Sequence, residues 1–506
     1  MTGATATVAE RLVILRRAYH SRGDRGSRSD VAYNVYLAAL LAPLVVFPVV
    51  RTIVLALSGS RVLAALVGPS SVPTVGMVLG LLMAALMWLG VLYGPVTLEP
   101  AFVRLLADTD LPRHRTLSRP FAIKAAAVVG VALMAAALFG GVLVNGGFAS
   151  LAGAARFTAL CAMFAVMAAV AWLAGQATSQ RVAGLAGALT TALALLGLAL
   201  PGFGRWLPWG WVAAAWPPIA GPPATTDLAL GVVAALAVVA TRPLLDRLRS
   251  SRLTDDATRW RAATTAALSG DVAHALGSLR ARPSVGRRWS AVRGGPSIAV
   301  FLVRDMVGAA RTPVRLLVGI VTLVAAVITL ALASSLPAGW VLASVGATGA
   351  YLAVGVLADG FRHATDAAVA PALYGYGTPA LFSRHGVAPL AGAAVAAALG
   401  AVSASALGIG MRLLPVCVVL ILVVLARAYD SAKGPLPVVL LTPMPSPIGD
   451  LSSVNVSLWE ADALIIAMVA GALAVAAAGS PVRLLVFALV VVALLVLGLR
   501  RRLRRL

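Results

Sequence analysis

The chain alternates between long apolar runs and short polar segments along its whole length. A helix that crosses a bilayer needs about 20 consecutive apolar residues. Runs near this length predict about twelve membrane-spanning helices, arranged as two six-helix halves in an all-α polytopic membrane protein. The predicted spans of the first half are 33–57, 73–97, 121–145, 156–176, 183–203 and 226–246, and those of the second half are 314–336, 339–358, 387–410, 412–427, 461–479 and 481–499.

Polar segments divide the chain into three regions. Residues 1–247 hold the first six spans, 248–296 form a basic linker, and 297–506 hold the second six spans. Acidic residues favour the first turn of a helix. We therefore expect Asp255, Asp256 and Asp271 to mark helix starts in the linker, which predicts a short helical pair between the halves.

Each half opens with an amphipathic segment that predicts an interface entry helix. Apolar residues recur at helical spacing in both segments, at Val8, Leu12, Leu15 and Tyr19 and again at Ala299, Leu302, Met306 and Ala310. Basic residues lie beside the first set or opposite the second, namely Arg11, Arg16, Arg17, Arg304 and Arg311. Such helices lie in the membrane plane, with the apolar face in lipid and the basic face toward the headgroups. The alternative is ordinary charge next to a membrane span.

Charge then fixes the expected orientation. The chain is 60% hydrophobic and 12% charged, with a net charge of +23. If the N-terminus is cytoplasmic, twelve spans place every Lys and Arg on the inner side except Arg51, Arg61, Arg156, Arg205, Arg412 and Arg483. This bias matches the positive-inside rule and predicts a multi-pass protein of the plasma (inner) membrane with both termini cytoplasmic. Nucleic-acid binding is not expected, because basic and aromatic residues are not interleaved.

Three loops carry distinctive residues. After the second span, Glu99 and Pro100 begin a segment that predicts a short polar helix projecting inward, and the segment from Asp359 occupies the matching place in the second half. Such a helix suits docking of a cytoplasmic partner, whereas the alternative is a solvated loop. The outer loop after the fifth span is rich in Trp and Pro, which favours an interface aromatic belt over re-entrant helices.

The polar residues exclude several kinds of chemistry. All acidic residues fall near span ends or in loops, and the five histidines also lie outside the predicted membrane core, which argues against proton coupling. Neither lysine, Lys124 nor Lys433, stands in a phosphate-binding loop motif. Cys161 and Cys417 lie in apolar runs and imply no disulfide. We expect no metal site, no cofactor and no enzymatic activity.

Two regions resemble the ABC-2-type exporter permeases, and in particular large actinobacterial members with two fused six-span halves. The resemblance rests on Gly94-Pro95-Val96 through Leu111-Pro112-Arg113, on Leu302-Val303-Arg304-Asp305 followed by Arg311-Thr312-Pro313, and on the Pro445–Asp450 loop. It implies a permease that works with separate ATP-binding subunits, expected in two copies. The contacts it implies with those subunits are Arg104, Asp108, Asp110, Arg113 and Arg115 in the first half, and Asp359, Arg362, Asp366 and Arg384 in the second.

The sequence therefore predicts the membrane subunit of an ATP-driven exporter. An apolar path between the halves favours amphipathic cargo. The second-half contact is expected to be weaker, because Pro371 and several Gly and Tyr residues follow where a helix is expected. An ion-coupled secondary transporter with the same 6+6 order is the main alternative. A membrane scaffold or a lipid-modifying enzyme is the third.

Overall fold

A computed structural model describes residues 47–69, 71–107, 111–219, 225–268, 285–292, 294–335, 339–368, 375–406, 410–434, 436–442, 444–446, 449–450 and 452–504, together with 32, 36, 39 and 283. The chain divides into two compact units, Met1–Arg261 and Ala262–Leu506. Both units are built almost entirely of α-helices.

Unit 1 contains α3 (Phe47–Leu57), α4 (Ser60–Val67), α5 (Ser71–Leu92), α6 (Pro100–Ala107), α7 (Arg113–Asn145), α8 (Leu151–Ala177), α9 (Gln180–Ala199), α10 (Pro201–Gly204), α11 (Pro208–Ala214), α12 (Thr225–Asp246) and most of α13 (Ser250–Leu268). Unit 2 contains α15 (Ser297–Ala310), α16 (Pro313–Ser335), α17 (Trp340–Val354), α18 (Asp359–Ala368), α19 (Thr378–His385), α20 (Val387–Ala406), α21 (Leu413–Ser431), the 3₁₀ turn η2 (Val438–Leu441), α22 (Ser452–Ala477) and α23 (Pro481–Leu503). Two-residue strands, β1 (Pro445–Ser446) and β2 (Gly449–Asp450), pair antiparallel before α22.

Ten helices in the described residues are long and apolar enough to cross a membrane, and eleven if α17 and α18 form one bent span. The chain is therefore a multi-pass membrane protein. Each predicted span from 73–97 onward corresponds to one of these helices, whereas the first predicted span is described only from Phe47, where α3 begins. The predicted total of twelve and the six-plus-six arrangement remain predictions.

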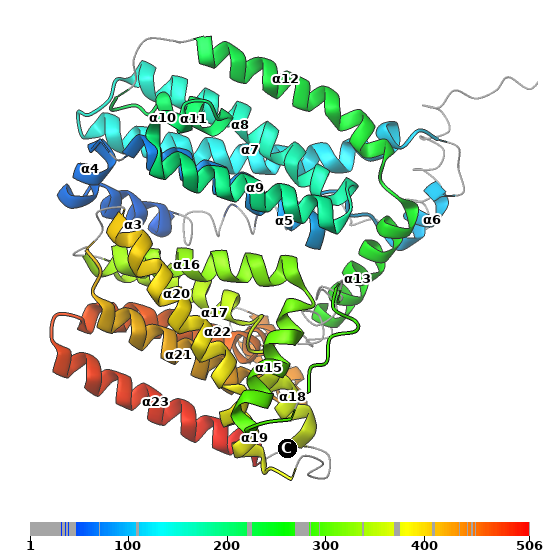
Figure 1. Cartoon of the computed structure of the whole chain (residues 1–506), viewed down its shortest axis with the longest axis vertical. Helices are drawn as coiled ribbons and strands as arrows, with labels where there is room; N and C mark the ends of the chain where they lie inside the picture. Colours follow the sequence, from blue (N-terminus) through cyan, green and yellow to red (C-terminus); the bar gives the residue numbers. More distant parts are fainter. Residues whose placement is uncertain are drawn as a thin grey trace, which may run out of the picture. The chain divides into compact units, whose positions relative to one another are not determined.

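Unit 1 is organised around α8, which contacts α5, α7 and α12 (Figure 1). Helices α5 and α8 cross at two glycines. A Cβ atom on Gly90 would lie 2.1 Å from the carbonyl oxygen of Trp172, and one on Gly175 would lie 2.1 Å from that of Met87. Only glycine permits this approach of two backbones, as in many membrane helix pairs.

The opposite end of unit 1 holds the Trp-rich segment. Trp209 of α11 and Trp216 are buried, and the indole N–H of Trp216 donates to the carbonyl of Leu66 at 2.8 Å. A cavity of about 100 Å³ lies between α5, α9 and α11. Trp206, by contrast, is 75% exposed. The segment therefore consists of two packed short helices, α10 and α11, and one exposed indole. The sequence analysis favoured an aromatic belt for the whole segment.

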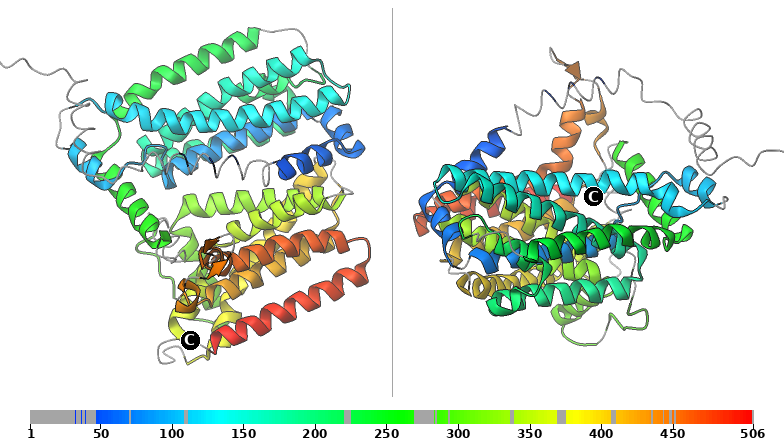
Figure 2. Two further views of the ribbon diagram at one scale, coloured as in Figure 1. Left: turned by 180° about the vertical axis from the view of Figure 1, so that it is seen from behind. Right: turned by 90° about the horizontal axis from the view of Figure 1, so that it is seen from above.

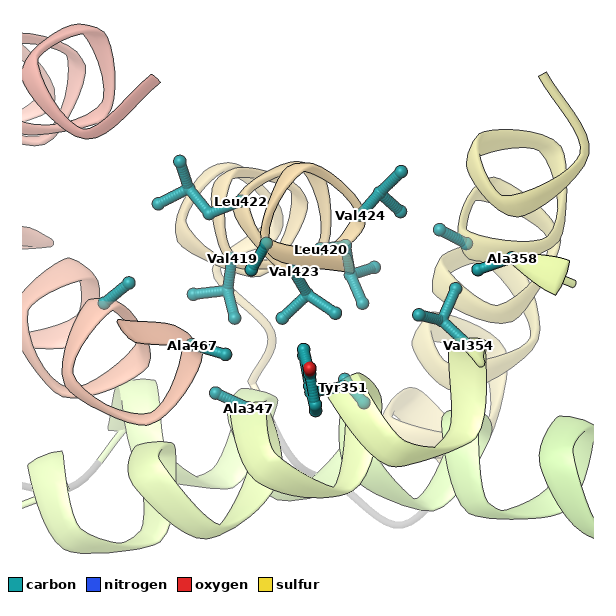
Figure 3. Close-up of a cluster of buried hydrophobic side chains, with 14 of the residues drawn as sticks. Ala347, Tyr351, Val354, Ala358, Val419, Leu420, Leu422, Val423, Val424 and Ala467 are labelled. Atoms are coloured by element: carbon teal, nitrogen blue, oxygen red, sulfur yellow. The ribbon is translucent and has the colours of Figure 1, made fainter. Parts of the chain in front are cut away.

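Unit 2 has its core where α17, α21 and α22 meet. Figure 3 shows Tyr351 of α17 beside Val419 and Val423 of α21, with Ala467 of α22 close by. Helices α17 and α22 pack through buried alanines, namely Ala343, Ala347 and Ala350 on α17 and Ala463, Ala467, Ala470 and Ala474 on α22. Helix α23 packs against α21 and α22 (Figure 2).

The two units share an order of helix contacts. In unit 1, α5 contacts α8 and α9, and α8 contacts α7 and α12. In unit 2, α17 contacts α21 and α22, and α21 contacts α20 and α23. In each unit, the five helices are the second to the sixth predicted spans of that half, and the contacts join spans of the same number. The repeat that the hydrophobic pattern suggested thus recurs in the packing of five helices in each unit.

One local prediction is wrong. Helix α13 begins at Ser250, so Asp255 and Asp256 lie in its second turn and do not start a helix. After α17, α18 starts at Asp359, in the place that the sequence analysis matched to the first-half helix, whereas Pro371 lies outside the described residues. Asp271 lies outside the described residues.

Candidate functional site

The candidate site in each unit is the group of short helices at one end of the bundle, which we call the charged end. In unit 1, α5, α8 and α12 end at the charged end, and α7 begins there. The start of α7 and the end of α12 are joined by a hydrogen bond, in which the backbone N–H of His114 donates to Oδ1 of Asp246 at 2.9 Å. The opposite end of unit 1 holds an ion pair between Arg156 of α8 and Asp227 of α12, with N–O distances of 2.7 and 2.9 Å.

Helix α6 lies on the surface of this end. Pro100 occupies its first position, where its missing N–H has no helical partner, and Val103 is buried in an apolar cluster. Arg104 is exposed, as the sequence expected for a contact residue. Asp108 and Asp110 lie outside the described residues.

The other two contact candidates of the first half belong to the start of α7. Arg113 is half-buried and donates from Nη2 to the hydroxyl of Ser250 at 2.8 Å, which joins α7 to α13. Arg115 is exposed. Arg104 and Arg115 are therefore accessible to a partner, whereas Arg113 has an internal role.

Gln176 is the polar centre of this end, and sequence reasoning missed it. Its side chain is 1% exposed, accepts from the backbone N–H of Val96 at 3.1 Å and donates to the Val96 carbonyl at 3.0 Å. It also donates to Oδ2 of Asp256 at 3.4 Å. A Cβ atom on Gly94 would lie 1.8 Å from Cδ of Gln176. Gln176 thus joins α8, the segment after α5 and the linker helix α13. One amide in the apolar run of 156–176 was the available signal.

Arg252 of α13 lies beside this centre. It donates to the carbonyls of Gly90 and Val91 at the end of α5, at 3.1 and 3.2 Å, and to that of Thr178 after α8, at 3.0 Å. A cation at two helix C-termini offsets the negative ends of their dipoles. Burial lowers the pKa of the Arg252 guanidinium, although Asp256 opposes this shift. Burial raises the pKa of Asp256, against the nearby charges of Arg252 and Arg259.

In unit 2, the charged end contains a sharp bend between α17 and α18. The two helices meet at 62°. Asp359, the first residue of α18, accepts hydrogen bonds from both Nη atoms of Arg315 in α16. Nη2 of Arg315 also donates to the carbonyl of Gly355 at 3.1 Å. The contact candidate Asp359 is therefore engaged internally. Its ion pair fixes the direction of α18 relative to α16 and α17.

A buried charged cluster lies between α15, α18 and α19. His385 is 1% exposed, and its Nδ1 lies 2.6 Å from Oδ2 of Asp305. Its Nε2 lies 3.2 Å from Nη1 of Arg304. Because a guanidinium only donates, Nε2 must accept and Nδ1–H must donate to Asp305. A Cβ atom on Gly360 would lie 2.3 Å from Nδ1 of His385, so only glycine lets α18 approach the cluster.

The remaining second-half candidates differ in accessibility. Arg384 is engaged: its guanidinium carbon lies 3.9 Å from the ring centre of Tyr376, and Nη1 donates to the Ala380 carbonyl at 2.9 Å. Arg362 is half-buried and Asp366 is exposed. His363, on the same helix, is also exposed. Among the described residues of this group, the accessible side chains therefore lie in the middle of α18.

The entry helix α15 is oriented differently from the expectation. Its buried side carries Phe301, Asp305 and Ala309, and Arg304 is bound to His385. The predicted apolar face is uncovered at Ala299 and Met306. Arg304 therefore turns into the protein, where His385 supplies its partner. The first-half residues Arg11, Arg16 and Arg17 lie outside the described residues.

A second polar network joins the C-terminal ends of α21 and α23 to the first half of α22. Asp462 pairs with Lys433, at 2.7 Å, and with Arg502. Arg502 also stacks on Tyr429, and Arg427 of α21 donates from Nε to the Tyr351 carbonyl of α17 at 2.7 Å. These residues hold the helices together within unit 2. The spacing of charges along the chain did not reveal which of them pair.

Within the described residues, no group of three or more His, Cys, Asp or Glu could hold a metal ion. No protein-family model matches the chain, and no curated protein or solved structure matches it. The resemblance to ABC-2-type permeases therefore rests on the sequence motifs alone.

Proposed function

We propose that the chain is the membrane-spanning permease subunit of an ATP-binding-cassette exporter in the plasma membrane. In this proposal, separate ATP-binding subunits hydrolyse ATP, and the chain moves an amphipathic substrate outward. Both termini would be cytoplasmic, which makes the charged ends the cytoplasmic ends. The resemblance in sequence and the repeated order of helix contacts support this function.

The bend between α17 and α18 is the observation that carries the proposal. A permease driven by another subunit needs a surface element that the partner can push and that is rigidly joined to membrane helices. Helix α18 meets this need because Asp359 binds Arg315 of α16 and Gly360 packs against the cluster of Asp305 and His385. A displacement of α18 would therefore be transmitted to α15, α16 and α17.

The structure narrows the residues proposed to contact the partner. In unit 1 we retain Arg104 and Arg115, which are exposed. In unit 2 we retain Arg362 and Asp366 and add His363. Asp359 and Arg384 would act indirectly, because each already binds groups within unit 2.

The test begins with the tagged full chain, purified in mild detergent from its native membranes. We expect a subunit that hydrolyses ATP to co-purify with it, and the pair to transport in vesicles only when ATP is present. The double variant His363→Ala, Asp366→Asn should weaken the association about tenfold, as expected for loss of polar interface contacts worth about 1.4 kcal/mol. Arg483→Gln, an exposed change near the start of α23, is the matched control.

One observation favours a second candidate, the ion-coupled secondary transporter. Asp305 of α15 and His385, the last residue of α19, form a buried titratable pair, and proton-coupled carriers use such pairs. In that case a proton gradient would drive transport by the isolated chain, and Asp305→Asn would abolish it. Under our proposal, the gradient alone drives none.

A further inference from the structure

We infer that the turn before α15, residues 285–292, binds the headgroups of anionic phospholipids at the surface of the bilayer. The turn is held in place by the residue that directly follows α15. Arg311 donates from Nη2 to the Trp289 carbonyl at 2.8 Å and from Nε to the Gly286 carbonyl at 3.3 Å. The N–H of Val285 donates to the Arg311 carbonyl at 3.4 Å.

These bonds place the turn next to the bilayer boundary. Helix α16 is long and apolar enough to cross a membrane and begins at Pro313, two residues after Arg311. Gly286 has φ +70°, and a Cβ atom there would lie 2.4 Å from the Trp289 ring. The turn therefore has a defined shape that depends on glycine.

The charge of this surface suits an anionic ligand. Arg287 and Arg288 are both exposed, and within the described residues neither forms an ion pair or a side-chain hydrogen bond. The only acidic residue between 285 and 311 is Asp305, which is buried against His385. The basic residues that follow the turn are engaged, since Arg304 of α15 binds His385 and Arg311, directly after α15, binds the turn. The headgroup contacts therefore fall to Arg287 and Arg288.

Exposed apolar side chains accompany these charges, which favours a lipid surface over a soluble acidic partner. Trp289 and Val292 are exposed in the turn, and Ile298, Val303 and Met306 are exposed along α15. Trp and Arg or Lys together are typical of the membrane interface, where the indole lies at headgroup level. Each basic residue near an anionic membrane surface strengthens binding about fivefold.

The experiment measures lipid binding to the purified full chain in a neutral detergent. A bimane fluorophore is attached at Gly294→Cys, since a Cβ atom there meets no atom within 4 Å, in a background with Cys161→Ala and Cys417→Ala. Short-chain phosphatidylglycerol and phosphatidylcholine are titrated separately. We expect phosphatidylglycerol to bind more tightly, and Arg287→Gln, Arg288→Gln to weaken its binding about 30-fold.

Two further arms make the test specific. Arg247→Gln, Arg249→Gln removes the same charge from two exposed arginines between α12 and α13, and it should change the affinity less than twofold. Glycerol phosphate, which lacks acyl chains, should give no response at the same concentrations. The inference is overturned if both lipids bind equally, if the two double variants lose the same affinity, or if glycerol phosphate alone reproduces the response.

Discussion

The hydrogen bonds of Gln176 lead to a strong prediction about stability. Replacing Gln176 by Ala removes the side chain that, within the described residues, satisfies both backbone polar groups of the fully buried Val96. The same change removes a partner of Asp256. Gln180, one turn later on α9, is exposed and provides the matched control.

The magnitude follows from the cost of unsatisfied groups. A buried N–H or carbonyl without a partner costs about 1–3 kcal/mol. With two such groups in Gln176→Ala, we expect the free energy of unfolding to fall by about 2–6 kcal/mol. Gln180→Ala should change it by less than about 0.5 kcal/mol, as for most surface substitutions. Gln176→Glu should also destabilise at neutral pH, because a carboxylate cannot donate to the Val96 carbonyl, and should recover on acidification.

The assay is unfolding in mixed micelles of a neutral detergent and dodecyl sulfate, followed by Trp fluorescence and gel filtration. The three variants and the parent chain are compared at one pH and then across a pH series. A loss below about 1 kcal/mol for Gln176→Ala, or a loss equal to that of Gln180→Ala, would refute the assigned role. It would mean that Val96 finds other partners when the amide is removed.

Three further predictions concern the charged ends. Because burial raises the pKa of Asp256, the folded chain holds this proton more tightly than the unfolded chain does. Stability from this group is therefore full below the ordinary pKa of about 3.9 and declines as pH rises through the raised folded pKa. Asp256→Asn should flatten the pH dependence of unfolding above about pH 4, whereas Asp255→Asn, an exposed neighbour, should leave it unchanged. For Asp305 and His385, a double-mutant cycle with Ala in unfolding experiments should give a coupling of about 1.5–3 kcal/mol, and additive single effects would argue against the pair. Arg315→Gln should lower the amount of substrate transported per ATP several-fold while the ATP-binding subunit stays bound, and loss of that subunit would contradict the role of Arg315 in transmission.

The sequence predicts the membrane helices well because long apolar runs leave few alternatives to a span. It also locates charge at span ends, where Asp246 and Asp359 are found, although Asp462 lies ten residues inside α22. It could not reveal which charges bind each other. Asp359 and Arg315 are 44 positions apart, and Asp305 and His385 are 80 apart, so their pairing depends on how the helices pack.

The same limit explains the contact candidates that proved internal. Arg384 and Arg113 look like free loop cations in the sequence, but each lies against a neighbouring segment, Tyr376 for the first and Ser250 for the second. Gln176 was overlooked for the opposite reason. A single amide in an apolar helix has no distinguishing pattern until the fold brings the backbone of Val96 beside it.

The central claim is that ATP hydrolysis on another subunit drives transport by this chain. The most direct test is transport in sealed vesicles that contain the purified chain with or without its ATP-binding subunit, energised either by ATP or by a proton gradient. We predict transport only with both the subunit and ATP, and none when a catalytically inactive ATP-binding subunit is used. Transport at full rate by the isolated chain, driven by the gradient without nucleotide, would contradict the account.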